Sequence, residues 1–399
     1  MRKLVWLLPA VMMAWACSDD LPVQNLVEAD AVNPKLRIEA TVGQDLTKSN
    51  AEGMVTDGHP WIDGDEIRLF SLDYDDFTGS GTVTRYEGAD YLNKGYRYVA
   101  SDHSWKNVSG DPVTLSNIKA RLYAYSPSFP TTGNDFYNAD GTLSPREVPI
   151  VFNTPNKVDF LYGTHRNTKD GTTESAEDNT VDTGGSTHEN GTNLDYVDNK
   201  NPLLRLFLKH AQTYVKIRLL KEAVNPEKKY PGQGVVTELD VMALKADVDQ
   251  YGRAIHVPAT GTNGAALPSK GFIDITSGTI TPTAYKVAQM TDLINGTTKT
   301  SFNLNPTVAS GATPSYNEAF VLLAPAEASL VRGFHLKVDG VDFYIACSSA
   351  ANPVEWKPGF KYTYDLVLTG KGMELVKGED GEVVTVKPWN DGGTTTGDF

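Results

Sequence analysis

The feature that most constrains the fold is a two-residue alternation of apolar and polar side chains in short segments. In residues 35–42 the even positions are apolar and the odd positions are polar. One face of such an extended segment is suited to a core and the other to water. The same alternation recurs in residues 204–210, 215–219, 362–368 and 383–387. These segments predict half-buried β-strands.

The turn-forming residues between these segments indicate an all-β chain. Clusters of Gly, Asn, Asp and Pro separate the apolar runs, and few stretches hold the 3.6-residue period of a helix. A chain of 399 residues suits two domains. The polar stretch 167–201 indicates a loop or linker between them, and residues 261–311 indicate turn-rich connections. We predict an N-terminal β-sandwich at residues 35–200 and a C-terminal one at 201–399.

Residues 1–16 have the properties of a bacterial signal peptide. A basic pair precedes an apolar run that is too short to span a bilayer as a helix, and Cys17 follows a small residue. This pattern resembles the lipobox cut by lipoprotein signal peptidase, which implies an acylated Cys17 and a flexible tether at 17–34. The alternative is a plain secretory signal with an incidental cysteine. Residues 18–20 resemble the acidic signal that sends Bacteroidetes lipoproteins to the cell surface, so we expect a surface-exposed outer membrane lipoprotein.

Charge and cysteine content exclude several classes of protein. The net charge of −14 disfavours nucleic acid and anionic lipid as partners. Cys347 is the one cysteine besides Cys17. If Cys17 is acylated, no intrachain disulfide can form, and Cys347 is expected to be a buried small hydrophobic residue.

The sequence contains no recognisable catalytic, cofactor-binding or metal-binding motif. The histidines lack the spacing of a zinc site, and no nucleophile elbow or phosphate loop is present. Residues 73–76 and 138–141 resemble parts of calcium loops, but solvated turns are the favoured interpretation. His210 follows an apolar strand and is interpreted as a core or edge histidine. We expect no enzymatic activity and no cofactor.

The aromatic residues admit two interpretations. Exposed tryptophans stack on sugars, whereas tryptophans in β-sandwiches more often fill the core. We favour the structural interpretation for Trp61 and Trp356.

Several segments together resemble the fimbrillin family, the type V pilins and Mfa-like surface proteins of Bacteroidetes. Each motif is degenerate, but their order spans nearly the whole chain. Besides the lipoprotein signal and the early strand, the motifs are Thr47-Lys48-Ser49, Trp61-x-x-Gly64-Asp65-x-Ile67, Leu122-Tyr123-Ala124-Tyr125-Ser126-Pro127, Asp159-Phe160-Leu161-Tyr162-Gly163, Leu206-x-Leu208-x-His210-Ala211 and Trp356-x-Pro358-Gly359-x-x-Tyr362-x-Tyr364-x-Leu366.

The resemblance implies a structural subunit of a fimbrium, built from two tandem transthyretin-like β-sandwich domains. It also implies assembly by strand exchange. A trypsin-like protease cuts behind the first strand, that strand leaves, and a C-terminal strand of the next subunit takes its place by β-augmentation. Lys48 is then the expected cleavage site and residues 35–48 the removable segment. The strand-exchange residues are Leu36, Ile38, Ala40 and Val42 in the leaving strand, and Val384 and Val386 in a donor strand at 383–389.

The partners expected from this resemblance are other pilin subunits, a trypsin-like protease and the lipid on Cys17. Two alternatives remain open. The chain could be a non-polymerising anchor or tip subunit, or it could be a surface-exposed glycan-binding lipoprotein with a similar β-sandwich build.

Overall fold

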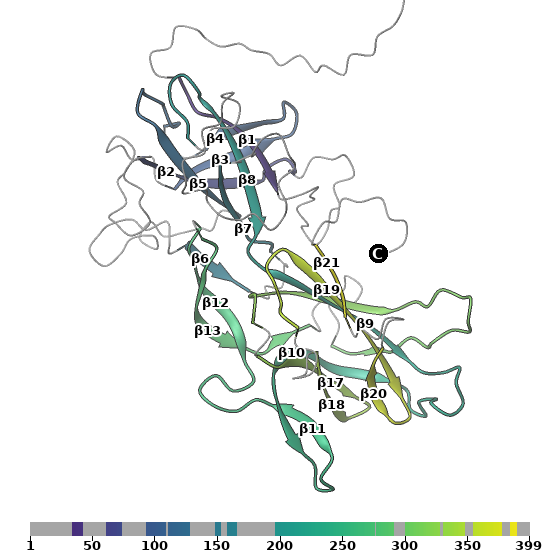
Figure 1. Ribbon diagram of the computed structural model, residues 1–399. Helices are drawn as coiled ribbons and strands as arrows, with labels where there is room; N and C mark the ends of the chain where they lie inside the picture. The colour runs from purple at the N-terminus through teal and green to yellow at the C-terminus, as the bar shows by residue number, and fades with distance from the viewer. Residues whose placement is uncertain are drawn as a thin grey trace, which may run out of the picture.

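The computed structural model describes residues 34–42, 61–73, 93–108, 111–127, 148–152, 158–165, 196–275, 277–290, 300–327, 330–347, 354–376 and 384–388. All regular secondary structure within these ranges is β-strand, which confirms the all-β prediction (Figure 1). These ranges contain no long apolar helix that could cross a membrane.

Seven strands form the first sheet. Its only parallel pair is β1 with β8, and the other neighbours are antiparallel. In order across the sheet the strands are β1 (Arg37–Val42), β8 (Leu203–His210), β7 (Leu161–His165), β5 (Ala120–Ser126), β2 (Glu66–Asp73), β3 (Lys94–Val99) and β4 (Ser104–Asn107).

The strand β8 lies in this first sheet, although the sequence analysis assigned it to the C-terminal sandwich. It pairs with β1 and β7, whereas β9 (Thr213–Lys221), which begins three residues after β8 ends, pairs with later strands. The chain therefore passes from one sheet to the next at Ala211 and Gln212. Alternation alone could not locate this change, because β8 and β9 show the same two-residue period.

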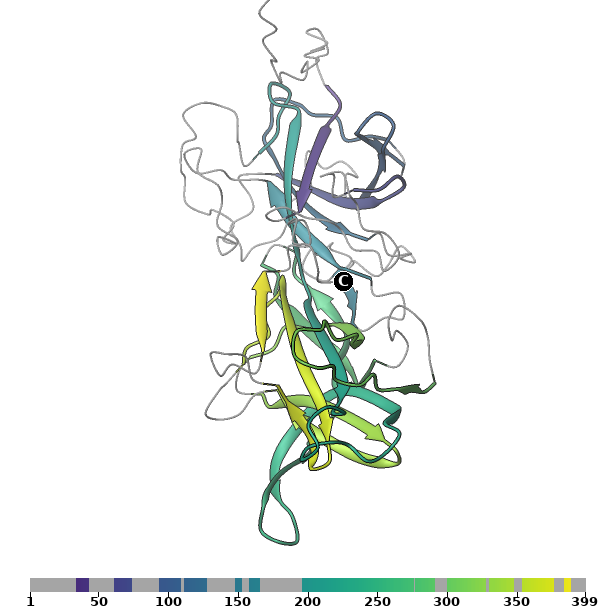
Figure 2. The same cartoon turned by 90° about the vertical axis from the view of Figure 1, so that its right-hand side faces the viewer.

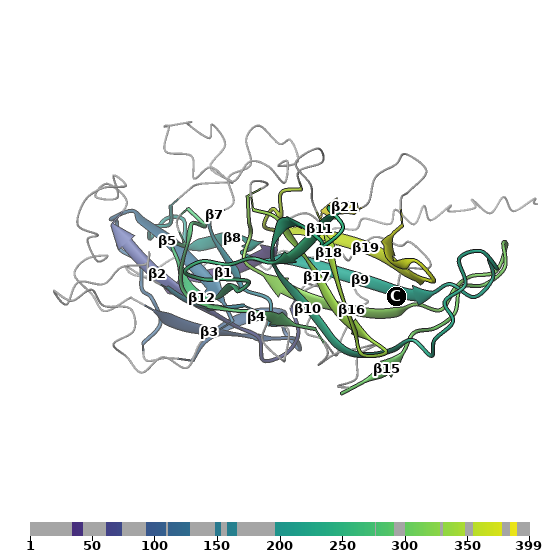
Figure 3. The ribbon, with the colours of Figure 1, turned by 90° about the horizontal axis from the view of Figure 1, so that it is seen from below.

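Two further sheets pack face to face in the C-terminal half. One contains β16 (Asn317–Leu323), β9, β19 (Phe360–Thr369) and β20 (Gly372–Leu375), with β21 (Thr385–Pro388) on β19. The other contains β11 (Ala254–Pro258), β10 (Val235–Val248), β17 (Arg332–Val338) and β18 (Val341–Ala346), with β14 (Ala288–Gln289) and β15 (Phe302–Asn303) on β10. Figure 3 shows β9 and β19 side by side in the first of these sheets.

The core between these sheets is made of alternate residues from their strands. Ile217 of β9, Val241 of β10 and Phe334 of β17 are fully buried in it. Cys347 and Trp356 are buried there too, which confirms both sequence interpretations. Burial raises the pKa of the Cys347 thiol, so this cysteine is held as an unreactive thiol.

A three-stranded sheet connects the two halves of the chain. It contains β6 (Val148–Val151), β12 (Leu267–Ile273) and β13 (Ile280–Lys286), and β6 pairs with β12 from Val148↔Ile273 to Val151↔Lys270. In Figure 1 these strands lie between the seven-stranded sheet and the C-terminal sheets. A strand from the N-terminal half is thus built into a sheet with a hairpin from the C-terminal half.

This small sheet covers the second face of the seven-stranded sheet. Phe70, Tyr123 and Tyr125 pack there against Ile150 and Ile273. The next residues along β2 and β5 point to the opposite face, where they join a separate core that includes β1. Strand β5 is therefore buried along its whole length. Such two-sided burial is the reason its sequence, Ala120–Ser126, shows no clean alternation.

The strands β12 to β15 occupy a region that the sequence analysis assigned to turns. The register of β12 with β13 shifts at Pro268/Lys270 and again at Lys270/Gly271, which breaks the alternation. A Cβ atom at Gly271 would lie 2.5 Å from the carbonyl oxygen of Thr281. Glycine is needed there because the neighbouring backbone is so close, and not because the chain turns.

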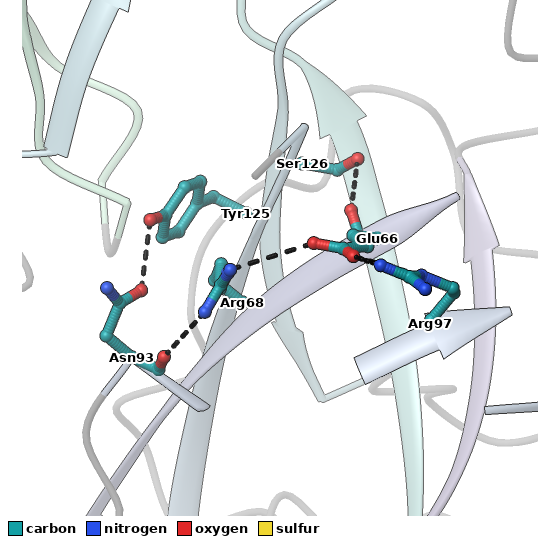
Figure 4. A network of polar contacts seen from close by, with 6 residues as sticks. All are labelled: Glu66, Arg68, Asn93, Arg97, Tyr125 and Ser126. Atoms are coloured by element: carbon teal, nitrogen blue, oxygen red, sulfur yellow. Dashed lines mark hydrogen bonds and ion pairs between the residues drawn. The ribbon is translucent and has the colours of Figure 1, made fainter. Parts of the chain in front are cut away.

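A polar network links three neighbouring strands of the seven-stranded sheet (Figure 4). Arg97 of β3 donates to Glu66 of β2, with Nε 3.0 Å from Oε1, and Ser126 of β5 donates to the Glu66 carbonyl at 2.9 Å. The Tyr125 hydroxyl donates to Oδ1 of Asn93 at 3.0 Å. These contacts connect β2, β3 and β5 near the start of β2 and the end of β5.

Replacing Ile150 by alanine should lower the free energy of unfolding by about 2–5 kcal/mol, because the side chain is buried between the three-stranded and seven-stranded sheets. Tyr285→Ala is the matched control: it lies in the same small sheet on β13, but its side chain is 42% exposed. Urea denaturation of both variants measures the difference. Equal losses in the two variants would show that the three-stranded sheet is not part of the core.

Candidate functional site

The strand β1 lies at one edge of the seven-stranded sheet and pairs in parallel with β8 (Figure 2). Ile38 lies opposite Leu204 and Ala40 opposite Leu206. Leu36 and Ile38 are buried, with exposed fractions of 7% and 9%, while Ala40 is half-buried. Val42 ends the strand opposite Leu208. The alternation of the sequence therefore corresponds to a strand with one face on the core.

Backbone bonds attach the start of β1 on both sides. The Leu36 amide donates to the Val113 carbonyl, and the Leu115 amide donates to the Pro34 carbonyl, both at 2.9 Å. On the β8 side, the Arg37 amide donates to the Pro202 carbonyl at 2.9 Å. The segment around Val113 thus covers the open side of β1 at its beginning.

A tryptophan side chain holds the second half of β1. The indole Nε1 of Trp61 donates to the carbonyl oxygen of Ala40 at 2.8 Å. Trp61 is only 4% exposed, and its ring meets the edge of Trp105 at 4.9 Å between centroids. The sequence correctly predicted a buried structural residue. Its contact with β1 could not be predicted, because Trp61 lies 21 residues beyond Ala40.

The core beneath β1 depends on its side chains. Leu36 and Ile38 pack in one cluster with Leu204, Leu206 and Trp61. Exposing a buried Leu or Ile costs about 1.5–3 kcal/mol, so removal of both represents roughly 3–6 kcal/mol before any relaxation. The apolar surface and the β8 backbone groups would then face water.

At the other end of the chain, β21 is a short strand on the edge of β19. Its register runs from Thr385↔Thr363 to Pro388↔Phe360. Val384 is half-buried against the C-terminal core, whereas Val386 is 45% exposed. Proline has no amide hydrogen for a sheet ladder, so Pro388 limits the hydrogen bonds of this strand. The structure thus places the two valines next to β19 in their own subunit.

Cys17 and Lys48 lie outside the described residues, as do the rest of segment 43–60 and residues 383 and 389. The acylation site and the cleavage site remain predictions from sequence. Of the two stretches compared with calcium loops, only Asp73 falls within the described residues, as the last residue of β2.

His210 is a buried residue that pairs with a carboxylate. Its Nδ1 lies 2.9 Å from Oδ2 of buried Asp159, at the point where the chain leaves the first sheet. Beside it, the Phe160 amide donates to Oε1 of Gln212 at 2.9 Å. These contacts fix the crossing between the sheets and agree with the interpretation of His210 as a core histidine.

One group of potential metal ligands occurs within the described residues. Glu238 and Asp240 of β10 and His335 of β17 each offer a ligand atom, and these atoms lie within 4.8 Å of one another. Asp240 and His335 are 95 residues apart in the sequence. Spacing along the chain gave no signal for this group, because strand pairing alone brings it together.

A family profile described as fimbrillin-like matches residues 54–389. The chain belongs to the fimbrillin-like family. This confirms the resemblance found in the sequence, and the matched region contains every described strand after β1.

Among solved structures, similar chains come from Bacteroides and Porphyromonas species. A candidate cell adhesion protein from Bacteroides uniformis is 14% identical, with a TM-score of 0.46, over 89% of this chain and 99% of that one. One from Bacteroides ovatus is 12% identical, with a TM-score of 0.47, over 90% and 99%. The tip fimbrial protein Mfa3 from Porphyromonas gingivalis is 10% identical, with a TM-score of 0.40, over 89% and 100%. No protein with a curated description matches the sequence significantly.

Changing Trp61 to phenylalanine should loosen β1, because the smaller ring stays apolar but lacks the N–H that donates to Ala40. The lost hydrogen bond contributes about 1 kcal/mol, so the open state of β1 should be populated roughly fivefold more and its amides should exchange roughly fivefold faster. Hydrogen–deuterium exchange of the amides in Arg37–Val42 measures it. Trp105→Phe is the control, because it alters the same ring contact but keeps the hydrogen bond from Trp61 to β1. Unchanged exchange in Trp61→Phe would show that the indole does not hold β1.

Proposed function

We propose that the protein is a fimbrial subunit that assembles by strand exchange. In this proposal a trypsin-like protease cuts after Lys48, β1 leaves, and residues 383–389 of another subunit pair with β8. The observation that carries the proposal is the position of β1: it is an edge strand, paired in parallel with β8, with Leu36 and Ile38 buried below it. Before cleavage, Cys17 anchors the chain to the outer membrane.

The edge position supports exchange because an edge strand can leave without breaking the sheet. The remaining neighbours of β8 and β7 stay paired, and the network around Glu66 lies on strands further inside. Departure of β1 leaves unpaired backbone groups on β8 and an uncovered apolar surface. Both are unfavourable in water and both favour addition of a new strand.

The C-terminal strand supports the donor role because little holds it in its own subunit. β21 has four residues, one of which is proline, and Val386 is largely outside the core. Val384 and Val386 lie on one side of an extended chain, as Leu36 and Ile38 do. Inserted beside β8, the valines would gain the burial that Val386 lacks beside β19.

The sequence around Lys48 supports cleavage there. Lys48 lies beyond the end of β1, whereas Arg37 is held within the strand by its pairing with Leu203. Proteases cut extended, accessible backbone and not backbone paired in a sheet. A cut after Lys48 releases all of β1 together with the lipid anchor.

We further propose that the subunit divides into two sandwich domains at Ala211 and Gln212, where the chain changes sheets. The alternative of a glycan-binding lipoprotein gains no support from Trp61 and Trp356. Both rings are buried, at 4% and 1% exposure, and cannot stack on a sugar at the surface.

Changing Lys48 to alanine should abolish polymerisation while the monomer stays folded, because β1 is then never released. Sheared surface fibres, analysed by electron microscopy and immunoblotting, provide the measurement. Lys245→Ala is the matched control, since Lys245 is an exposed lysine on β10 away from the proposed cut. Wild-type amounts of Lys48→Ala subunits in fibres would contradict proteolytic activation at this site.

Aspartate at both Val384 and Val386 should block donation, because a charge buried beside β8 would lack a partner. Such subunits should still accept a donor and so end growing chains in mixtures with wild type. Thr385→Asp is the control, since its side chain points to the opposite side of the strand. If the double variant polymerised as well as the control, another segment would be the donor.

A further inference from the structure

The outer face of the β10–β17–β18 sheet carries a polar group that strand exchange does not use. Asp240 of β10 lies opposite His335 of β17, and Glu238 lies opposite Lys337. The intervening residues Leu239 and Leu336 belong to the core. By the two-residue period of a strand, the polar side chains therefore face away from the core together.

Three neighbours fix the ring of His335. Its Nε2 lies 3.0 Å from Oδ1 of Asp342 on β18, and its Nδ1 lies 3.1 Å from Oδ2 of Asp240. The ring also stacks on Tyr344, with centroids 4.8 Å apart. The His335 side chain is 7% exposed, so its orientation is set by packing as well as by hydrogen bonds.

Each ring nitrogen of His335 lies beside one carboxylate, and the tautomer decides which nitrogen donates. In the tautomer that carries its proton on Nε2, this N–H donates to Asp342 and the lone pair of Nδ1 points to Asp240. Metal-binding histidines have this arrangement, in which the second nitrogen donates to a carboxylate that orients the ring. The hydrogen bond between Nδ1 and Asp240 is the main cause of the raised pKa of His335.

The distances suit a small ion. Zinc bonds of about 2.0–2.2 Å in tetrahedral geometry place neighbouring ligand atoms roughly 3.3–3.5 Å apart. The Nδ1–Oδ2 distance of 3.1 Å is close to this spacing. The Glu238 side chain is 48% exposed and can rotate to complete the set.

We propose that Glu238, Asp240 and His335 bind a divalent transition metal ion of the zinc type, with Asp342 as a positioning residue. One imidazole nitrogen and two carboxylates favour zinc over calcium, which prefers oxygen ligands. A bound ion would connect β10 to β17 and, through Asp342, to β18. It would stabilise the C-terminal sheets independently of what happens at β1.

Lys337 provides an internal competitor. Its ammonium nitrogen lies 3.3 Å from Oε1 of Glu238, so a metal ion must displace it. Removing this charge should therefore strengthen metal binding. A site without a metal function would show no such gain.

The test is isothermal titration of the folded chain with Zn²⁺. We expect one saturable site that His335→Gln abolishes and that Glu238→Gln weakens about tenfold or more. Asp342→Asn should weaken binding about 10–100-fold through the lost orientation of the ring. Lys337→Met should tighten it. His256→Gln is the matched control, because His256 lies on β11 of the same sheet but outside the group.

Glu238 and Asp342 keep the test independent of folding, because their side chains are 48% and 46% exposed and their variants should melt like wild type without metal. Absence of saturable zinc binding would overturn the proposal. So would zinc binding that Glu238→Gln and Asp342→Asn leave unchanged, or calcium binding as tight as zinc binding.

Discussion

The pairing of β6 with β12 is the interaction on which the arrangement of the molecule depends. It joins a strand from the N-terminal half to a hairpin from the C-terminal half, with Ile150 opposite Gly271. The resulting sheet buries one face of β2 and β5, while a second core buries the other. The middle strands therefore cannot move without exposing two cores. Displacement of a strand costs the least free energy at the edges of the sheet.

The edges also explain how one subunit could both accept and donate a strand. At one edge, β1 covers an apolar surface that would be unfavourable in water. Its pairing with β8 is parallel, and parallel pairing is slightly weaker per residue than antiparallel pairing. At the C-terminal end, β21 covers little and has a proline in its ladder. In the proposed exchange, replacement of β1 by the donor would restore burial in the acceptor, and the donor subunit would lose only a short, partly exposed strand.

The sequence predicted the strands that bury one face only, and it missed strands with irregular register or burial on both faces. β1 and β19 alternate cleanly because one face meets a core and the other meets water. β12 carries two register shifts, and its partner β6 lies more than one hundred residues earlier, so no local pattern could reveal it. The assignment of β8 to the first sheet depended likewise on long-range pairing with β1 and β7.

For the candidate sites, the same difference applies. The burial of Leu36 and Ile38 could be predicted from sequence, because a half-buried strand alternates. The bond from Trp61 to Ala40 and the group of Glu238, Asp240 and His335 could not, because they form between residues distant in sequence. The family resemblance came from motifs that are degenerate individually but informative in their order, and the family profile over residues 54–389 confirms it.

The most direct test of the central claim is the N-terminal residue of subunits inside surface fibres. Mass spectrometry of sheared, washed fibres identifies it without any variant. Strand exchange after cleavage at Lys48 predicts chains that begin at Ser49 and lack β1. Fibres whose subunits begin at acylated Cys17 and still contain residues 35–48 would contradict the account.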